Sequence, residues 1–407
     1  MLKDSTIDRK KTKDPPMQVS RIENELLLCC GTTLNSPGKL SRIRRLTQGG
    51  IDWPYLIRPA RRHGVMPLLY WNLKEIHFET VPEGVLKELC DEYRINLIRN
   101  LFLTAKLFNL LDLFQSNGLS AIPYKGPTLS VLAYGDICLR HFNDLDFIIH
   151  RDDVLRAKEL LLSEGYRSEY VLPADQEAAY LQHECEYNFF DDHRKILIEL
   201  HWDIVQKYFS CHFDVNKLWD DIKPVSLLGR QVMTVSPEQL LLILCLHHGG
   251  KHQWETLGWI CDIAQLIGVR KDLDWGRILD NAFRSGVERI LFLGLYLAKD
   301  MLGADIPKEI NKRLLNDKAI PSLAKEVCKW IFTETESLPG EAERFVFYLR
   351  MRENVKDKMR YCFRRLFTST ETDWSLLRLP ASLFPFYRFL RPFRLVKKFG
   401  VKALRAG

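Results

Sequence analysis

The sequence predicts an α/β protein, of the α+β kind, in which a small mixed sheet lies between two helical domains. Residues 121–149 have the pattern strand, short helix, strand, and residues 186–202 have the pattern of a hairpin. Before and after this region, apolar residues recur three and four positions apart, which is typical of amphipathic helices. These three observations together define the predicted fold class.

The same patterns divide the chain into five parts. A polar tail comes first, and a tail rich in basic and apolar residues comes last. The predicted ranges are 1–21 for a flexible tail, 22–115 for N-terminal helices, 116–235 for the core with the sheet, 236–370 for C-terminal helices, and 371–407 for a basic amphipathic tail.

The composition is that of a globular protein: 46% of the 407 residues are hydrophobic and 27% are charged. The net charge of +7 suits an anionic partner without selecting one. The ten cysteines are scattered and form no C-x-x-C pair, so neither a zinc ribbon nor a disulfide framework is predicted. No secretory signal or membrane-spanning run is expected. We therefore expect a cytoplasmic protein, free or peripheral to the membrane.

The N-terminal domain should consist of helices, with strong helical patterns in residues 51–73 and 85–114 and a break at Pro82. The second pattern predicts a long core helix that leads into the first strand. Residues 61–63, with the sequence Arg-Arg-His, are interpreted as a solvated helix face rather than a ligand site.

The centre of the core is a pair of aspartates at the start of a strand. The strand of residues 121–124 should be followed by a turn, a short helix over residues 127–134, and a second strand that opens with Asp144-Leu-Asp146. Side chains two apart in a strand lie on one face, so both carboxylates point the same way. Crowded carboxylates at the mouth of a buried strand favour a bound cation. The alternative interpretation is a solvated turn before a strand.

A helix over residues 151–164 and a strand over residues 165–172 should follow. A hairpin is then predicted, with a turn at residues 191–193 and a second strand that ends in KILIELHW. Alternation in that strand places Glu199 and His201 on one face. An ordinary exposed strand glutamate is the alternative for Glu199.

Helices should fill the C-terminal domain, beginning with Ser236 as the N-cap and Pro237 at the first helical position. His247, His248 and His252 are interpreted as buried or hydrogen-bonding histidines rather than as metal ligands, because Gly249-Gly250 interrupts their helix face. Further helices are predicted over residues 278–302, 308–315, 322–332 and 342–367.

Two segments carry a resemblance to known proteins: YKGPTLSVLAYGD, from Tyr124, and LRHFNDLDFII, from Leu139. They resemble the nucleotidyltransferase fold of the DNA polymerase beta superfamily. More narrowly, they are similar to a largely uncharacterised bacterial nucleotidyltransferase-like family with a K-G-x-x-L helix and an R-x-x-x-D-x-D segment. Residues 50–73 and 251–267 resemble the helical parts of that family, so the similarity covers most of the chain.

This resemblance implies a two-metal site in which Asp144, Asp146 and Glu199 hold Mg²⁺ or Mn²⁺ ions about 3.5 to 4 Å apart. Lys125, Gly126 and Arg140 would then support the phosphates of a nucleoside triphosphate. The superfamily usually has Gly-Ser or Gly-Gly where this chain has Lys125-Gly126, so the phosphate contacts should differ.

The resemblance also implies a substrate pocket. His201 should contact substrate or orient Glu199, and the second role is preferred. Lys251, His252, Trp254 and Asp262 are candidates for shaping the acceptor pocket. The implied acceptor is a sugar, another small molecule, RNA or a protein side chain.

The tail of residues 371–407 has eight Lys and Arg residues from Arg378 onward among apolar ones. It should either lie on an anionic membrane surface or pack on the body as a terminal helix.

Two other functions remain open besides metal-dependent transfer of a nucleoside monophosphate with release of pyrophosphate. One is a glycosyltransferase that uses the D-x-D segment with a sugar nucleotide. The other is a non-catalytic nucleotide-binding or scaffold protein in surface-polysaccharide synthesis.

Overall fold

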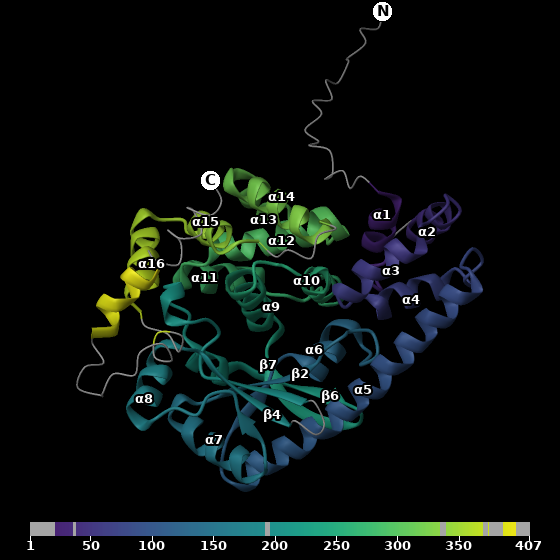
Figure 1. The fold of residues 1–407 in the computed structure, drawn as a ribbon. Helices are drawn as coiled ribbons and strands as arrows, with labels where there is room; N and C mark the ends of the chain where they lie inside the picture. The colour runs from purple at the N-terminus through teal and green to yellow at the C-terminus, as the bar shows by residue number, and fades with distance from the viewer. Residues whose placement is uncertain are drawn as a thin grey trace, which may run out of the picture.

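The computed structural model describes residues 21–35, 38–191, 196–333, 339–368, 373 and 386–395. The described part is a mixed α/β fold, as predicted: the sheet lies under a layer of C-terminal helices, and the N-terminal helices lie beside that layer (Figure 1). The predicted flexible tail, apart from Arg21, and most of the predicted basic tail lie outside the described residues.

The main sheet has five strands in the order β1-β2-β5-β4-β3. Strands β2 and β5 are parallel neighbours, and the other pairs are antiparallel, which makes the sheet mixed, as predicted. The strands are β1 (Ala121–Pro123), β2 (Asp144–Ile149), β3 (Arg167–Ser168), β4 (Glu186–Asp191) and β5 (Ile196–His201). The hairpin of β4 and β5 is confirmed, whereas its predicted turn lies mostly outside the described residues.

One face of the sheet is apolar and packs against a helix, and the carboxylate of Asp146 lies on the other face. Ile196, Ile198 and Leu200 of β5 are buried on one face, as the alternation predicts. Helix α5 (Glu83–Ser116) packs against the sheet through Phe114, whose ring meets that of Phe147 edge-on at 5.4 Å between centroids. Since successive strand residues point to opposite faces, Asp146 points away from the face that Phe147 shares with α5.

The N-terminal helices confirm the predicted helical region, including a long core helix, α5, before the first strand. Asp52 caps α3, where its Oδ1 accepts a hydrogen bond of 3.0 Å from the amide of Tyr55. The helices before α5 are α1 (Ile22–Cys29), α2 (Lys39–Thr47), α3 (Trp53–Arg62) and α4 (Met66–Glu75).

Short helices link the strands of the core. The segment after β1 is α6 (Gly126–Leu129), which continues as a π-helical turn (Ser130–Tyr134), close to the predicted range. Helix α7 (Val154–Ser163) precedes β3, and α8 (Ala174–His183) follows it. The predicted strand over residues 165–172 was too long, because only Arg167 and Ser168 pair with β4.

A second, two-stranded sheet was not predicted. It consists of β6 (Ile222–Leu227) and β7 (Arg230–Val235), joined at Leu228 and Gly229, which both have positive φ. Leucine is a rare residue in such turns, so the usual hairpin signal is missing. Thr234 donates a hydrogen bond of 2.6 Å to the carbonyl of Pro123 and thereby ties this sheet to β1.

Ser236 caps the first C-terminal helix, as predicted, by accepting a hydrogen bond of 3.4 Å from the amide of Gln239. Two predicted helices are each broken in two: the first at Gly286, which has a φ of 66°, and the second at residues 352–354. The helices are α9 (Pro237–Cys245), followed by a π-helical turn (Leu246–Lys251), α10 (Leu257–Val269), α11 (Trp275–Ser285), α12 (Glu288–Leu302), α13 (Lys308–Asn316), α14 (Ala319–Phe332), α15 (Glu341–Met351) and α16 (Val355–Phe367).

All ten cysteines are free thiols. No helix in the described ranges is long and apolar enough to cross a membrane.

Candidate active site

The register of β2 and β5 brings two acidic residues together. Asp146 is paired directly with Glu199, and Asp144 is paired with Leu197. Paired residues of parallel neighbours point to the same face, about 5 Å apart. The structure therefore places the predicted acid of the later strand beside the second aspartate.

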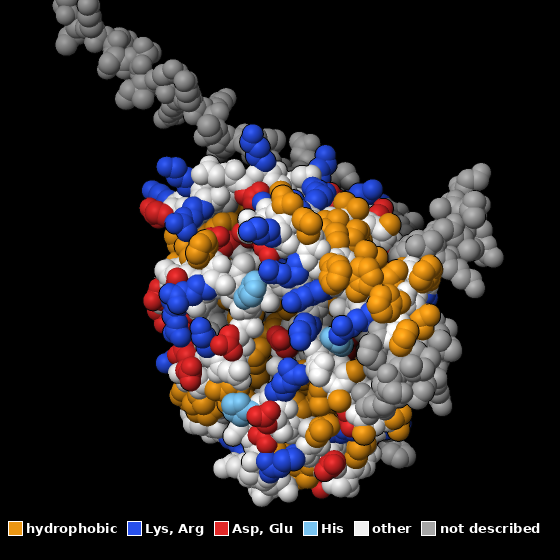
Figure 2. All heavy atoms as spheres, turned by 90° about the vertical axis from the view of Figure 1, so that its left-hand side faces the viewer, with side chains coloured by type: hydrophobic (Ala, Val, Ile, Leu, Met, Phe, Trp, Pro, Cys, Tyr) orange, Lys and Arg blue, Asp and Glu red, His pale blue; other side chains and the backbone are white. Residues whose placement is uncertain are grey.

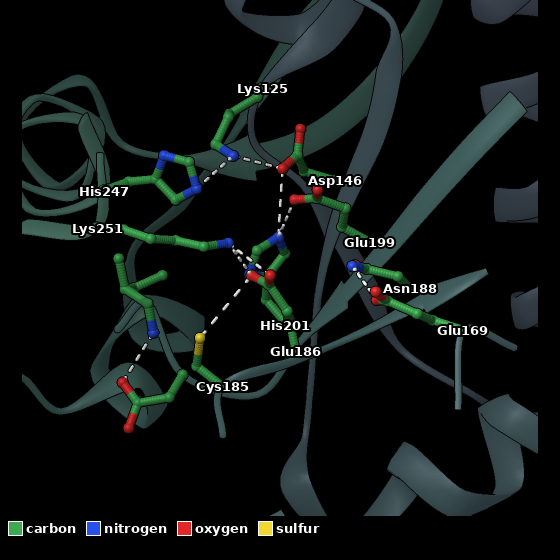
Figure 3. Close-up of polar contacts among 12 residues, drawn as sticks. Lys125, Asp146, Glu169, Cys185, Glu186, Asn188, Glu199, His201, His247 and Lys251 are labelled. Atoms are coloured by element: carbon green, nitrogen blue, oxygen red, sulfur yellow. Dashed lines mark hydrogen bonds and ion pairs between the residues drawn. The ribbon is translucent and has the colours of Figure 1, made fainter. Parts of the chain in front are cut away.

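Asp146 lies at the centre of the polar cluster and is only 2% exposed. Its Oδ1 is 2.5 Å from Lys125 Nζ and 3.2 Å from His201 Nε2. Its Oδ2 is buried and accepts no hydrogen bond from the described residues. Figure 3 shows the Lys125 ammonium group between Asp146 and His247, whose Nε2 is 3.1 Å from Nζ.

His201 joins the two acids of the site to a third acid behind them. Its Nε2 is 3.2 Å from both Asp146 Oδ1 and Glu199 Oε2, and its Nδ1 is 3.3 Å from Glu186 Oε2. Glu186 in turn accepts hydrogen bonds of 2.5 and 2.6 Å from Lys251 Nζ (Figure 3). Burial disfavours the imidazolium form, but hydrogen bonds to Asp146 and Glu199 and the charge of Glu186 outweigh it and raise the pKa of His201.

Asp144 stands at the cavity side of this cluster and is half-buried. Burial raises the pKa of Asp144 to about 7, and the negative charges of Asp146 and Glu199 add to this effect. Glu199 behaves in the opposite way: burial opposes its charge, but the hydrogen bond from His201 and the charge of Lys125 keep the pKa of Glu199 low. Three carboxyl groups therefore face one lysine and one histidine in this cluster.

Gly126 allows the chain to pass close to the mouth of β2. Its φ is +51°, in the region that favours glycine, and a Cβ atom at this position would lie 3.3 Å from the carbonyl oxygen of Asp144. This close approach places Lys125 directly over Asp146. Lys125, which was predicted to support phosphates, thus binds the Asp146 carboxylate.

Arg140 and Asp262, predicted for different parts of the site, form one buried pair. Arg140 Nε is 3.0 Å from both carboxylate oxygens of Asp262, and Tyr134 donates a hydrogen bond of 2.9 Å to Oδ1. Burial still raises the pKa of Asp262 above its usual range. Arg140 Nη1 is buried and donates no hydrogen bond within the described residues, and Arg140 lines the same cavity as Asp144.

Sequence reasoning missed two residues that hold Arg140 in place. Asn96 donates a hydrogen bond of 2.8 Å to the carbonyl of Cys138, and Asn100 donates one of 2.8 Å to the carbonyl of Arg140. Both side chains are buried on α5. A signal existed in the sequence: two asparagines four residues apart interrupt the apolar face of a long helix.

The two glycines after His248 permit tight packing of the π-helical turn. A Cβ atom on Gly249 would lie 2.7 Å from Trp254 Nε1, and one on Gly250 would lie 2.8 Å from the ring of Phe209. Trp254 is fully buried behind this turn and does not line the cavity. Lys251 is occupied by Glu186, so neither of these two predicted pocket residues faces the cavity.

His247 and His248 are buried, as predicted, and His252 is partly buried. The three rings lie close to one another and to Trp259. The rings of His248 and Trp259 stack at 5.0 Å with an angle of 5°. Burial, with the charge of Lys125 among the lesser causes, lowers the pKa of each histidine well below its usual value. They are therefore neutral at pH 7.

A cavity of about 490 Å³ lies next to the carboxylates. Its lining includes Asp144, Glu199, Arg140, His252 and Asp262. The end of α3 closes a further side with residues 61–63. The solvated-face interpretation was wrong for His63, which is buried.

Asp146, Glu199 and His201 each offer one ligand atom within 4.8 Å of the others, a spacing that could hold a metal ion. The predicted set named Asp144 in place of His201, and Asp144 stands beside this group. Carboxylate oxygens suit Mg²⁺ and Mn²⁺, whereas an imidazole nitrogen is a more usual ligand of Zn²⁺ or Fe²⁺. The unpartnered Asp146 Oδ2 and the clustering of three carboxyl groups both fit a divalent cation.

Residues 49–303 of the chain match a protein family described as an uncharacterised nucleotidyltransferase. No curated protein shows significant sequence similarity to the chain.

Proposed function

Because the chain belongs to the uncharacterised nucleotidyltransferase family, we propose that it is a metal-dependent nucleotidyltransferase. It transfers a nucleoside monophosphate from a nucleoside triphosphate to an acceptor hydroxyl and releases pyrophosphate. The proposed ion is Mg²⁺ or Mn²⁺, held by Asp144, Asp146 and Glu199 with His201 beside them.

One observation carries this proposal. Asp146 and Glu199 come from parallel neighbouring strands in direct register, and they meet Asp144 beside a cavity of about 490 Å³. A solvated turn or an ordinary surface glutamate would not have a buried partner acid. Groups whose pKa is strongly shifted by burial and by neighbouring charges, as that of Asp144 is, cluster at functional sites.

A divalent cation bound to these carboxylates would supply the positive charge that neutralises the triphosphate and the leaving pyrophosphate. In our proposal, Lys125 gives up its hydrogen bond to Asp146 and binds phosphate with the Gly126 amide. Arg140, held by Asp262 through Nε, offers its unpartnered Nη1 to the same phosphates.

Glu199 is assigned to the acceptor side, where it accepts a hydrogen bond from the attacking hydroxyl. A bond forms between the hydroxyl oxygen and the α-phosphorus, while the bond between the α-phosphorus and the pyrophosphate oxygen breaks. The hydroxyl proton passes to the Glu199 carboxylate. His201 orients Glu199 and is itself held by Glu186.

The acceptor pocket is assigned to His252 and Asp262, which line the cavity, with Lys251 and Trp254 supporting the turn behind it. The core over residues 116–235 would carry the carboxylates, and the two helical domains would close the cavity. The acceptor is a sugar, another small molecule, RNA or a protein side chain.

The position of a radioactive label tests the reaction. With Mg²⁺ and a cell extract as the source of acceptors, the purified protein should move the α-phosphate label, and not the γ-label, onto an acceptor. Glu199→Gln should stop this transfer and leave nucleotide binding largely intact. Transfer of the γ-label would rule the proposal out. Use of a sugar nucleotide would indicate a glycosyltransferase, and nucleotide binding without turnover would indicate a scaffold.

A further inference from the structure

Helix α16 presents apolar side chains to solvent. Val355, Met359, Phe363 and Leu366 are 70, 68, 63 and 41% exposed. Their spacing of four, four and three residues places them in one stripe along the helix. On the opposite side of α16, Tyr361 is only 1% exposed, and its ring stacks on Phe345 of α15. The helix is thus anchored by one face and leaves its apolar stripe outside.

A second apolar stripe lies next to the first. Residues 386–395 are helical, and four of their side chains are exposed: Phe386, Phe389, Leu390 and Phe393. This segment is joined to α16 by a hydrogen bond of 3.0 Å from Arg391 Nε to the carbonyl of Arg365. Figure 2 shows the side of the molecule on which α16 lies, with hydrophobic side chains gathered beside Lys and Arg side chains.

Basic residues flank these stripes. On α16, Lys356 and Arg360 follow one side of the stripe, and Lys358 and Arg365 follow the other, as their positions on the helix require. Exposed apolar patches bordered by polar residues mark sites of interaction.

A pocket of about 260 Å³ adjoins α16 and lies between that helix, the end of α8 and the loop after β5. Arg151, Lys207 and Arg364 line it, together with the acids Glu184 and Asp203. Burial, followed by the charges of these three cations and of Arg388, lowers the pKa of His183 to about 4. Positive charge from α16 and from residues 386–395 is thus present near this pocket.

We propose that this face, formed by α16, residues 386–395 and the adjoining basic pocket, docks on an anionic lipid bilayer. The exposed phenyl and aliphatic side chains insert at the boundary of headgroups and acyl chains. The flanking cations bind the lipid phosphates. Anionic bilayers bind amphipathic helices that have large apolar side chains on one side and Lys and Arg residues beside them.

The charge of the face argues against a second copy of the chain as its occupant. A two-fold interface places the same patch against itself, so the basic residues would oppose one another across it. An anionic bilayer satisfies both the apolar and the basic groups. This inference concerns a surface outside the catalytic cavity and does not depend on nucleotidyl transfer.

The experiment is co-sedimentation of the full chain with vesicles. Vesicles of phosphatidylcholine with phosphatidylglycerol should bind the protein, phosphatidylcholine alone should bind it far more weakly, and added salt should weaken the binding. The double variant Met359→Gln/Phe363→Gln should lose at least about tenfold in affinity, because two large apolar side chains no longer insert. Ile98→Gln, at a residue on α5 that is 67% exposed, is the matched control and should bind normally.

The proposal would be overturned if the full chain did not bind anionic vesicles. It would also be overturned if the double variant bound them as tightly as the parent chain. A dimer in solution that the double variant converts to a monomer would overturn it too, because the stripe would then be an interface between copies. Thermal melting of each variant without lipid shows that the fold is intact. Since the assay contains no nucleotide, its result is separate from the test of the proposed reaction.

Discussion

The ammonium group of Lys125 lies 2.5 Å from Oδ1 of Asp146, so a lysine from the turn after β1 neutralises an aspartate at the start of β2. Both side chains are almost fully buried. A buried carboxylate needs a positive partner, and in the metal-free site Lys125 is that partner for Asp146. We infer that Lys125 stabilises the Asp146 carboxylate in the metal-free protein. A bound metal ion would replace Lys125 at Asp146, and Lys125 would then bind the triphosphate.

Lys125→Met should lower the free energy of unfolding of the metal-free protein by about 3–5 kcal/mol, because it leaves the Asp146 carboxylate buried without this partner. Millimolar Mg²⁺ or Mn²⁺ should recover more of the melting temperature in this variant than in the parent protein. Thermal melts with and without the ion measure both effects. A variant that melts like the parent at every ion concentration would contradict the inferred role.

Asp144→Asn and Asp146→Asn should both abolish transfer but should change the metal-free stability in opposite directions. The raised pKa of Asp144 means that its charge is unfavourable, so the amide should raise the melting temperature slightly. Asp146→Asn should lower it, because Lys125 and His201 lose their shared acceptor charge. Asp153→Asn, at the start of α7, is the control for a carboxylate outside the site. Transfer at the parent rate by either site variant would refute the proposed roles.

His63 should make the fold sensitive to mild acid. Its Nε2 is 2.9 Å from the carbonyl of Ile331, and its Nδ1 accepts from the amide of Leu257, so the neutral ring joins α3 to α14 and α10. Burial, followed by the charge of Arg62, lowers the pKa of His63 to about 4. The folded-state pKa lies below the unfolded value, so this stabilisation is complete above pH 6.5 and is lost as the pH falls toward 4. The loss amounts to about 3 kcal/mol.

Denaturant unfolding between pH 7 and pH 4 measures this effect as the difference between the parent and His63→Gln. A difference is needed because burial raises the pKa of Asp203 to about 6, which acts in the opposite direction. His63→Gln should be less stable at pH 7 and should lose less stability on acidification. His77→Gln, at an exposed histidine, should follow the parent. Parallel curves for the parent and His63→Gln would disprove the assignment.

Gly258→Ala should loosen the contact between α3 and α10. A Cβ atom at Gly258 would lie 2.7 Å from the carbonyl oxygen of His63, and a backbone atom cannot rotate away. We expect a loss of about 1–3 kcal/mol in the free energy of unfolding, as for other overpacked sites. Gly84→Ala, on α5 with open space around it, is the matched control and should be neutral or stabilising by up to about 1 kcal/mol. Equal stability of the two variants would refute the close contact.

The sequence by itself determined the elements that depend on local pattern. Alternation in KILIELHW placed Glu199 and His201 on one face, and the same period gave Asp144 and Asp146 a shared direction. The long helix before the first strand and the Ser236 cap were also predicted, because spacing and capping act within a few residues. The resemblance supplied the expectation that Glu199 belongs beside the aspartates.

Only the tertiary structure decided which groups meet across long separations. The pairs of Lys125 with Asp146, Arg140 with Asp262, and Glu186 with Lys251 each join residues far apart in the chain. No local pattern encodes them, since each depends on how strands and helices pack. For the same reason, a helical period shows that α16 has two faces but not which one is buried. Packing of Tyr361 against the body settled that choice and left the apolar stripe exposed, because a helix is anchored by the contacts that the rest of the fold offers it.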